Sequence, residues 1–275
     1  MRTKLDKNIL WHLPLILAVF LQLWPIIFMA STSFKDMNQI FTSTLNPLPF
    51  PPTLNNYVAV LEDFPFWTYV YNTFLIATLV TVCKIATSVL AAFAFVYYEF
   101  KGKETIFNFM LLTFFIPITV LIMPNYLLMS KLGLLNTPWG VILPQIADGM
   151  GIFLMRQTIR GIPKPLLEAA LLEGAGAIGI LTKVVLPLIK PSAIAVTIFF
   201  FIHSWNEYFW PLLVLQDKEN YTLPLALQMF ISAEGGSEWG IAMAVAMLTS
   251  VLPLLLYLFC QKYILSTFLQ SGVKG

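Results

Sequence analysis

Side chains able to do chemistry are sparse in this sequence. The two histidines, His12 and His203, and the two cysteines, Cys83 and Cys260, lie in four separate apolar runs, and none has a second ligand at metal-binding spacing. The sequence contains no G-x-x-x-x-G-K-[ST] phosphate loop, no H-E-x-x-H and no G-x-S-x-G. We therefore expect neither an enzyme nor a nucleotide-binding subunit, and no cofactor or metal ion held by this chain.

A second group of side chains is polar yet lies within long apolar stretches. An ionisable group at membrane depth is energetically costly, so each is a functional candidate by default. The group consists of Lys84, Gln145, Asp148, His203, Asn206 and Glu207. We expect Lys84 to snorkel or to pair with an acid rather than to contact a ligand. Gln145 and Asp148 lie in a glycine-containing segment, where they either line a translocation path or serve the structure.

Four consecutive residues combine aromatic rings with an amide and a carboxylate: Trp205, Asn206, Glu207 and Tyr208. An aromatic face beside such polar groups suits a polyhydroxylated ligand, which makes this segment a candidate substrate path. Aromatic rings also anchor helices at a membrane interface. The sequence supports both interpretations.

The elements that must position these residues are membrane helices. Of the 275 residues, 58% are hydrophobic and 11% are charged, which leaves too little polar surface for a soluble domain. The net charge of +2 gives no indication of nucleic-acid binding. Lipid offers no partner for free backbone groups, so we expect an all-α membrane protein. A single transmembrane domain with six helices is predicted, at about 9–30, 71–98, 106–129, 139–155, 185–215 and 241–263.

Three of these runs are unusual. The first, at 9–30, could be a signal peptide, but its length and Pro25 argue against cleavage. The fourth, at 139–155, is short and contains Pro144, which predicts an irregular segment shielded from lipid or lining a water-filled path. The fifth, at 185–215, exceeds the length of one span and either begins as a cytoplasmic helix, tilts, or breaks near Pro211.

Basic residues fall into alternate segments between the runs, and lysine and arginine are retained on the cytoplasmic side of a membrane. One set of segments carries Arg2, Lys4, Lys7, Lys101, Lys103, Arg156, Arg160, Lys164, Lys183, Lys190, Lys262 and Lys274. The opposite loops carry only Lys35, Lys131 and Lys218, beside the acidic residues Asp36, Glu62, Asp63, Asp217, Glu219, Glu234 and Glu238. We therefore expect both termini and the loop at 161–187 to be cytoplasmic.

The loop at 161–187 has a pattern of its own. Pro165 suits a first helical turn, and the helix formers that follow end at Gly174 and Gly176. A second short helix is predicted at about 177–185, with Pro187 marking the entry to the fifth run. The loop is too short to be stable alone and carries several apolar side chains. It either docks against another protein or packs on the chain's own inner surface.

A family resemblance distinguishes these two interpretations. The sequence Glu168-Ala-Ala-x-x-Glu-Gly-Ala175, followed by Leu186-Pro187 and Pro191, resembles the EAA loop of bacterial importer permeases. The resemblance implies the type I ABC importer permease fold, in which this loop holds a coupling helix that inserts into an ATPase subunit. The implied docking residues are Glu168, Ala169, Ala170, Glu173, Gly174, Ala175, Leu186 and Pro187. ATP and Mg²⁺ would be bound by the partner ATPase.

Weaker segments extend the resemblance over most of the chain. They are Ser33-Phe34-Lys35, Asn72-Thr73, 133–137, 205–211, 233–239 and 272–275. In this order they are similar to the second permease of the maltose-type carbohydrate subfamily, and to its glycerol-3-phosphate branch.

That subfamily resemblance implies a set of partners in the bacterial cell membrane: a second homologous permease as heterodimer, an ATPase dimer, an extracytoplasmic solute-binding protein and lipid. The implied function is import of a mono- or oligosaccharide, with glycerol-3-phosphate or a related polyol phosphate as the alternative. A secondary transporter is a remote alternative, since we find no inverted repeat.

Overall fold

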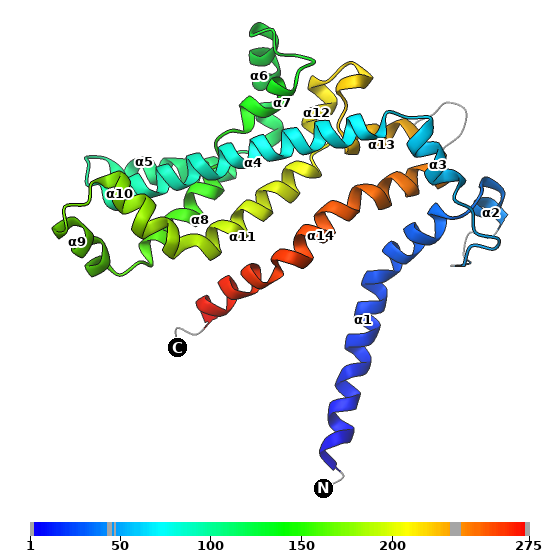
Figure 1. The fold of residues 1–275 in the computed structure, drawn as a ribbon, viewed down its shortest axis with the longest axis horizontal. Helices are drawn as coiled ribbons and strands as arrows, with labels where there is room; N and C mark the ends of the chain where they lie inside the picture. Colours follow the sequence, from blue (N-terminus) through cyan, green and yellow to red (C-terminus); the bar gives the residue numbers. More distant parts are fainter. Residues whose placement is uncertain (1–2, 43–45, 47, 232–237, 273–275) are drawn as a thin grey trace. The chain divides into compact units, whose positions relative to one another are not determined.

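The computed structural model describes residues 3–42, 46, 48–231 and 238–272 of the chain. In those ranges every regular element is helical and no strand occurs (Figure 1). Most of the segment 233–239, with Glu234, and of 272–275 lies outside the described residues. Two compact units share the chain: Met1–Trp67 with Ala226–Leu252, and Thr68–Leu225 with Pro253–Gly275.

The first unit is fastened by polar contacts around the end of its first helix. Asn56 donates from Nδ2 to the carbonyls of Ser33 (2.9 Å) and Lys35 (2.8 Å), and the Tyr57 hydroxyl lies 2.8 Å from Ser33 Oγ. Lys35 is 1% exposed and its ammonium donates to the carbonyl of Asn46. This unit contains α1 (Thr3–Ser33), α2 (Met37–Thr42), α3 (Asn55–Glu62), α13 (Leu223–Ile231) from Ala226 onward, and α14 (Trp239–Gly272) as far as Leu252.

The second unit contains the residues of functional interest. Its helices are α4 (Phe66–Tyr97), α5 (Lys103–Leu112), α6 (Ile118–Lys131), α7 (Pro138–Ile142), α8 (Gly149–Arg160), α9 (Lys164–Leu172), α10 (Ala177–Ile180), α11 (Leu186–Trp205) and α12 (Phe209–Val214). A hydrophobic core, here called core A, joins α4, α8, α10 and α11 through Val89, Ala92, Phe93, Met155, Ile159, Ile180, Val185, Ile189, Val196 and Phe200. Core A connects helices that are distant in sequence.

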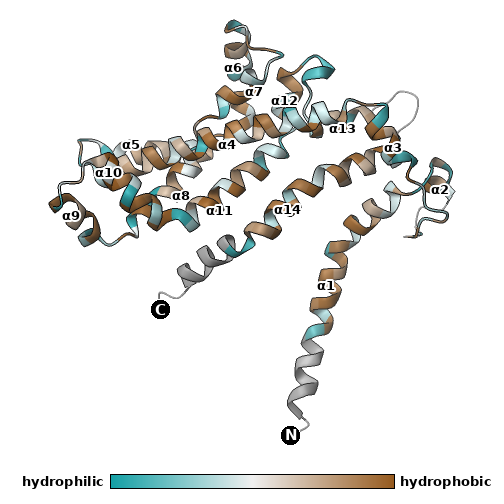
Figure 2. Ribbon diagram, in the orientation of Figure 1, coloured by the Kyte–Doolittle hydropathy of each residue, from teal (hydrophilic) through white to brown (hydrophobic). Residues whose placement is uncertain are grey.

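Four helical stretches are long and apolar enough to cross a membrane: His12–Ser33, Phe66–Tyr97, Ala177–Trp205 and Trp239–Lys262. Hydrophobic residues predominate along these helices (Figure 2), as lipid contact requires. A fifth span results if the bent pair Lys103–Phe115 and Ile118–Lys131 counts as one. Among the described residues, length and composition therefore support four or five spans rather than six.

The continuous helix predicted at 106–129 is wrong, because the run is bent by 99°. The break lies at Ile116, whose backbone is extended with φ −83° and ψ 116°, directly before Pro117. Proline disfavours helical geometry in the residue that precedes it. The run therefore ends one helix at this point and begins α6 immediately afterwards.

The fourth run is irregular, as predicted. α7 passes into a 3₁₀ turn at Leu143–Gln145, and α8 begins only after Asp148, which has extended backbone geometry. With 12 residues, α8 is too short to span a membrane alone. The interruption at 146–148 places polar groups in the middle of an otherwise apolar unit.

The fifth run confirms part of its prediction. Residues 177–185 are helical, and Pro187 lies in the first turn of α11, where a missing N–H is tolerated. The two segments are not separate, because a π turn at Leu181–Val185 joins them into one continuous helix from Ala177 to Trp205. That helix ends at Trp205 and α12 begins at Phe209, so the break lies shortly before Pro211, near which one of the three alternatives placed it.

Candidate functional site

The first candidate site is the loop around α9. Pro165 lies in the first turn of this helix, as predicted, and Gly174 follows its end with φ +81°. The Ala175 amide donates to the carbonyl of Ala170 (3.0 Å), which closes the turn. A positive φ strains residues that carry a β-carbon, so the turn requires glycine. The predicted helix and glycine turn are both present.

α9 has two different faces. Leu167, Ala170 and Ala175 pack against core A. Leu171 and Leu172 are exposed, the latter with 90% of its area accessible, and Leu172 lies on the side of the helix away from Ala170. A short helix with exposed leucines leaves apolar area that a partner protein would cover.

The other residues predicted for this loop are also accessible. Glu168, Ala169, Glu173, Gly174, Leu186 and Pro187 are exposed, and Leu186 and Pro187 lie on α11 beyond the π turn. Because these residues are all exposed, a docking partner can reach them.

A charged cleft of about 340 Å³ lies between α9 and the junction of α4 with α5. Arg156 lines it from α8, is 4% exposed, and donates from Nη2 to Glu104 Oε1 (2.6 Å). The Arg156 guanidinium carbon also lies 3.8 Å from the ring centroid of Phe107. Arg156 was expected between the fourth and fifth runs but lies within α8. Its pairing connects the beginning of α5 to α8.

The second candidate site is an ion pair inside the apolar unit. Lys84 Nζ on α4 lies 3.4 Å from Asp148 Oδ2, which confirms that Lys84 pairs with an acid. Asp148 also accepts the Gly151 amide at Oδ1 (2.9 Å) and so caps α8. Gln145 donates to the carbonyl of Val141 (3.1 Å). Asp148 thus holds the start of α8, Gln145 bonds within its own helical turn, and neither lines the cavity on α11. Their place on a substrate path stays a prediction.

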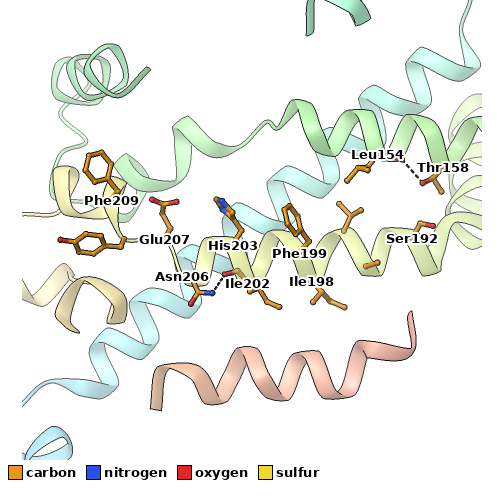
Figure 3. A pocket seen from close by; sticks show the side chains of 13 residues that line it. Leu154, Thr158, Ser192, Ile198, Phe199, Ile202, His203, Asn206, Glu207 and Phe209 are labelled. Carbon is orange, nitrogen blue, oxygen red and sulfur yellow. Dashed lines mark hydrogen bonds between the residues drawn. The ribbon is translucent and has the colours of Figure 1, made fainter. Parts of the chain in front are cut away.

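That cavity is a groove of about 910 Å³ along α11 (Figure 3). Its lining consists of Leu154, Thr158, Ser192, Ala195, Val196, Ile198, Phe199, Ile202, His203, Asn206, Glu207, Tyr208 and Phe209. The surface is apolar along most of its length and polar at the end of α11, where His203, Asn206 and Glu207 meet it. None of the described residues on it is a lysine or arginine.

The groove contains three of the four residues predicted from 205–208. Asn206 donates to the carbonyl of Ile202 (2.9 Å), and Glu207 Oε1 accepts the Trp210 amide (3.2 Å), capping α12. Trp205 is 2% exposed and does not line the groove. His203, which had no assigned role in the predicted path, joins the lining because it lies one turn before Asn206 on the same helix.

Asn136 is a further residue whose role the sequence did not reveal. It has φ +60°, its Oδ1 accepts the amides of Gln216 (3.0 Å) and Asp217 (2.9 Å), and its Nδ2 donates to the Asp217 carboxylate (2.6 Å). Asparagine tolerates left-handed geometry and can bond to backbone amides at the same time. The segment 133–137, noted for its resemblance, therefore fastens the turn before α7 to the loop after α12.

A set of three or more His, Cys, Asp or Glu side chains suited to a metal ion is not found in the described ranges. What the geometry offers is an exposed helix joined to a buried core, a membrane-embedded ion pair and a groove between apolar helices. Together with the spanning helices, these features define a multi-pass membrane transport component.

Comparison with known proteins identifies the family. Residues 84–268 match the model for binding-protein-dependent transport system inner membrane components, and the chain belongs to this family. It is 32% identical over 281 residues to the arabinooligosaccharides transport system permease protein AraQ of Halalkalibacterium halodurans, covering 100% of each chain. It is also 32% identical over 271 residues to the sn-glycerol-3-phosphate transport system permease protein UgpE of Yersinia pestis, covering 96% of each.

A solved structure gives the same result for the fold. A chain of a bacterial ABC transporter involved in import of the acidic polysaccharide alginate superposes with a TM-score of 0.84 at 26% identity, covering 96% of this chain and 98% of that one. The chain is therefore a permease subunit of a binding-protein-dependent importer with the type I ABC permease fold.

Proposed function

We propose that this permease imports an uncharged saccharide, powered by ATP that partner subunits hydrolyse. It would form a single transmembrane domain in the bacterial cell membrane, paired with a second homologous permease. An ATPase dimer would bind ATP and Mg²⁺, and an extracytoplasmic solute-binding protein would deliver the cargo. The observation that carries the proposal is α9, a helix that packs on core A through Leu167 and Ala170 and leaves Leu171 and Leu172 exposed.

The exposed face of α9 is the proposed ATPase-docking surface. Docking would involve Glu168, Ala169, Ala170, Glu173, Gly174, Ala175, Leu186 and Pro187, the residues of the EAA-like pattern. Burial of Leu171 and Leu172 at an interface would remove apolar area from water, which favours association. The loop and both termini would lie on the cytoplasmic side, where lysine and arginine are retained.

The groove along α11 supports an uncharged cargo. The relatives carry names for arabinooligosaccharides, sn-glycerol-3-phosphate and alginate, so the family accommodates neutral and anionic solutes. Phosphates and carboxylates are usually bound by arginine or lysine. The groove offers Glu207 and no lysine or arginine among its described lining residues. The aromatic rings of Phe199, Tyr208 and Phe209 beside the Asn206 amide suit the apolar and hydroxylated faces of a sugar.

The proposed mechanism is alternating access. Closure of the ATPase dimer would bring the two docked loops together and tilt the helices from an inward-open to an outward-open state. Cargo would pass from the binding protein to the groove, and hydrolysis would reset the subunits. In this chain, closure of the ATPase dimer would displace α9 first. The displacement would reach the groove through core A, because α10, α11 and the packed residues of α9 share that core.

The test is uptake by vesicles that contain both permeases, the ATPase and the binding protein. We expect uptake of a labelled neutral oligosaccharide to require internal ATP and to exceed uptake of sn-glycerol-3-phosphate. Greater uptake of the phosphate ester would support the alternative cargo. Transport that persists without the ATPase and follows an ion gradient would contradict the importer assignment for this chain.

The polar end of the groove gives a prediction about cargo contact. We expect Asn206→Ala to reduce saccharide uptake roughly fivefold, about the effect of one lost hydrogen bond. Asn108→Ala, the same substitution at an exposed position of α5 outside the groove, serves as the matched control and should retain uptake. Initial rates are compared at equal amounts of assembled complex. Unchanged uptake by Asn206→Ala would remove this residue from the path.

A further inference from the structure

The Lys84–Asp148 pair is more than two charges that neutralise each other. Lys84 is 7% exposed, and its ammonium group lies 5.4 Å from the ring centroid of Phe200 on α11, in addition to its contact with Asp148. Lys84 itself belongs to α4, and Asp148 is the N-terminal cap of α8. One ammonium group thus contacts residues from two other helical segments at once.

Neighbouring contacts fasten the same junction. Thr87, one turn along α4 from Lys84, donates to the carbonyl of Ile146 (2.9 Å) in the break before α8. Gly151, in the first turn of α8, has no room for a side chain: an added β-carbon would clash with Ser88 and lie 2.5 Å from Phe200. The three helices therefore approach one another as closely here as their backbones and ring permit.

This junction lies on the same helix as the proposed input from the ATPase. Phe200 belongs to core A, and so do Ile180 and Val185, from α10 and the π turn. Leu167 and Ala170 of α9 pack against that core. The helix that carries Phe200 continues without a break back to Ala177, three residues after Gly174. A displacement of α9 is therefore passed to α11 through packed side chains and an unbroken helix.

A neutral junction would hold these helices together with less energetic penalty, since burying two charges costs several kcal/mol that their attraction only partly recovers. What charges add is range: van der Waals contacts lose about a quarter to a half of their energy over a gap of about 0.5 to 1 Å, whereas the attraction between opposite charges falls only with the inverse of their distance. The Lys84–Asp148 pair, with the Lys84 ammonium group also over the Phe200 ring, therefore resists separation of α4, the start of α8 and α11.

We propose that Lys84 and Asp148 form a membrane-embedded strut that makes α8 and α11 follow the docked loop as one body, so that ATP hydrolysis is coupled to cargo movement. Both are positioning residues, because neither lines the groove. The inference rests on the proposed function, since it assumes an ATPase docked at α9. It predicts a loss of coupling when the pair is removed, distinct from a loss of folding.

The experiment compares single and double variants in the reconstituted importer. Lys84→Met and Asp148→Asn each leave one charge buried without a partner, so we expect less assembled complex. The double variant Lys84→Met/Asp148→Asn removes both charges and retains an oxygen at position 148 that can accept the Gly151 amide. We therefore expect its assembly to recover.

The readout is the number of ATP molecules hydrolysed for each cargo molecule taken up. We expect this ratio to rise on the order of threefold to tenfold in the assembled double variant, the size of coupling free energies carried by contact networks. Lys84→Arg keeps the positive charge, so we expect its ratio to lie closer to the wild-type value than that of the double variant. A double variant that assembles and keeps the wild-type ratio would overturn the strut, because the pair would then serve folding alone.

Two further measurements distinguish a failure of the strut from a failure of the proposed function. If the double variant fails to assemble, Phe200→Leu tests the same junction without altering a charge, and an unchanged ratio there would count against the proposal. If wild-type vesicles show no ATP-dependent uptake and bind no ATPase, the proposed function itself fails. The assembly of each variant is measured by copurification of the ATPase and the second permease.

Discussion

We expect uptake to fall on the order of a hundredfold when Gly174 is replaced by aspartate, and the ATPase no longer to copurify with the permease. Gly174 is exposed, and no atom lies within 4 Å of a β-carbon built there, so the side chain fits without collision inside this chain. The loss of ATPase binding arises at the docking surface, because a charge buried there without a partner costs about 2 to 5 kcal/mol. Backbone strain at φ +81° adds to that cost.

A matched control separates strain from docking. Gly133 has φ +68° and equally open surroundings, but it lies in the turn after α6, away from α9 in sequence. Gly133→Asp therefore introduces the same charge with similar strain, and we expect it to retain ATPase binding. Gly174→Ala adds the strain without the charge and should show an intermediate effect. Equal ATPase capture by Gly174→Asp and the wild type would refute docking at this turn.

The features that the sequence could predict are those that local chemistry decides. Pro165 begins α9 and Gly174 ends it because a ring without an N–H and a residue without a β-carbon act on their own backbone. The pairing of Lys84 with an acid was predictable for a similar reason, since a lone charge in an apolar unit is too costly to persist. Only its partner required the structure.

The features that escaped prediction depend on packing between distant segments. Arg156 lies within a helix, and not between the runs as its charge suggested, because Glu104 and the ring of Phe107 allow the guanidinium group to be buried. Pro187 lies in the first turn of α11, as expected for the entry to the fifth run, but the π turn that joins this helix to 177–185 was not predicted. The bend at Pro117 is different, because the proline rule alone could have predicted it within the run 106–129.

The groove shows the same division between local and tertiary information. Asn206, Glu207 and Tyr208 were chosen for their chemical types, and their adjacency in sequence was sufficient to bring them to one place. Gln145 and Asp148 were chosen for the same reason, yet their hydrogen bonds hold a helix break instead. Polar type at membrane depth thus identifies residues under constraint, and geometry decides whether the constraint is ligand contact or helix termination.

Gly151→Leu should prevent assembly of a stable permease, and Gly151→Ala should lower the free energy of unfolding by roughly 1 to 3 kcal/mol. The reason is close approach: a β-carbon would clash with Ser88 Oγ on α4 and lie 2.5 Å from Phe200 on α11, so the Ser88 side chain, the Phe200 ring or the helices themselves must shift to admit it. Separation would also stretch the Lys84–Asp148 pair, because Asp148 caps the turn that contains Gly151.

Thermal unfolding of the purified complex in detergent measures this effect. Gly179→Ala is the matched control, since Gly179 is also helical, and its β-carbon would make only an ordinary 3.8 Å contact with Ala175. Alanine is the better helix former, so Gly179→Ala should leave stability unchanged or raise it by about 0.5 to 1 kcal/mol. If Gly151→Ala were as stable as Gly179→Ala, the three helices could not be packed as closely as described. The Lys84–Asp148 pair would then lack the close helix packing that its proposed coupling role requires.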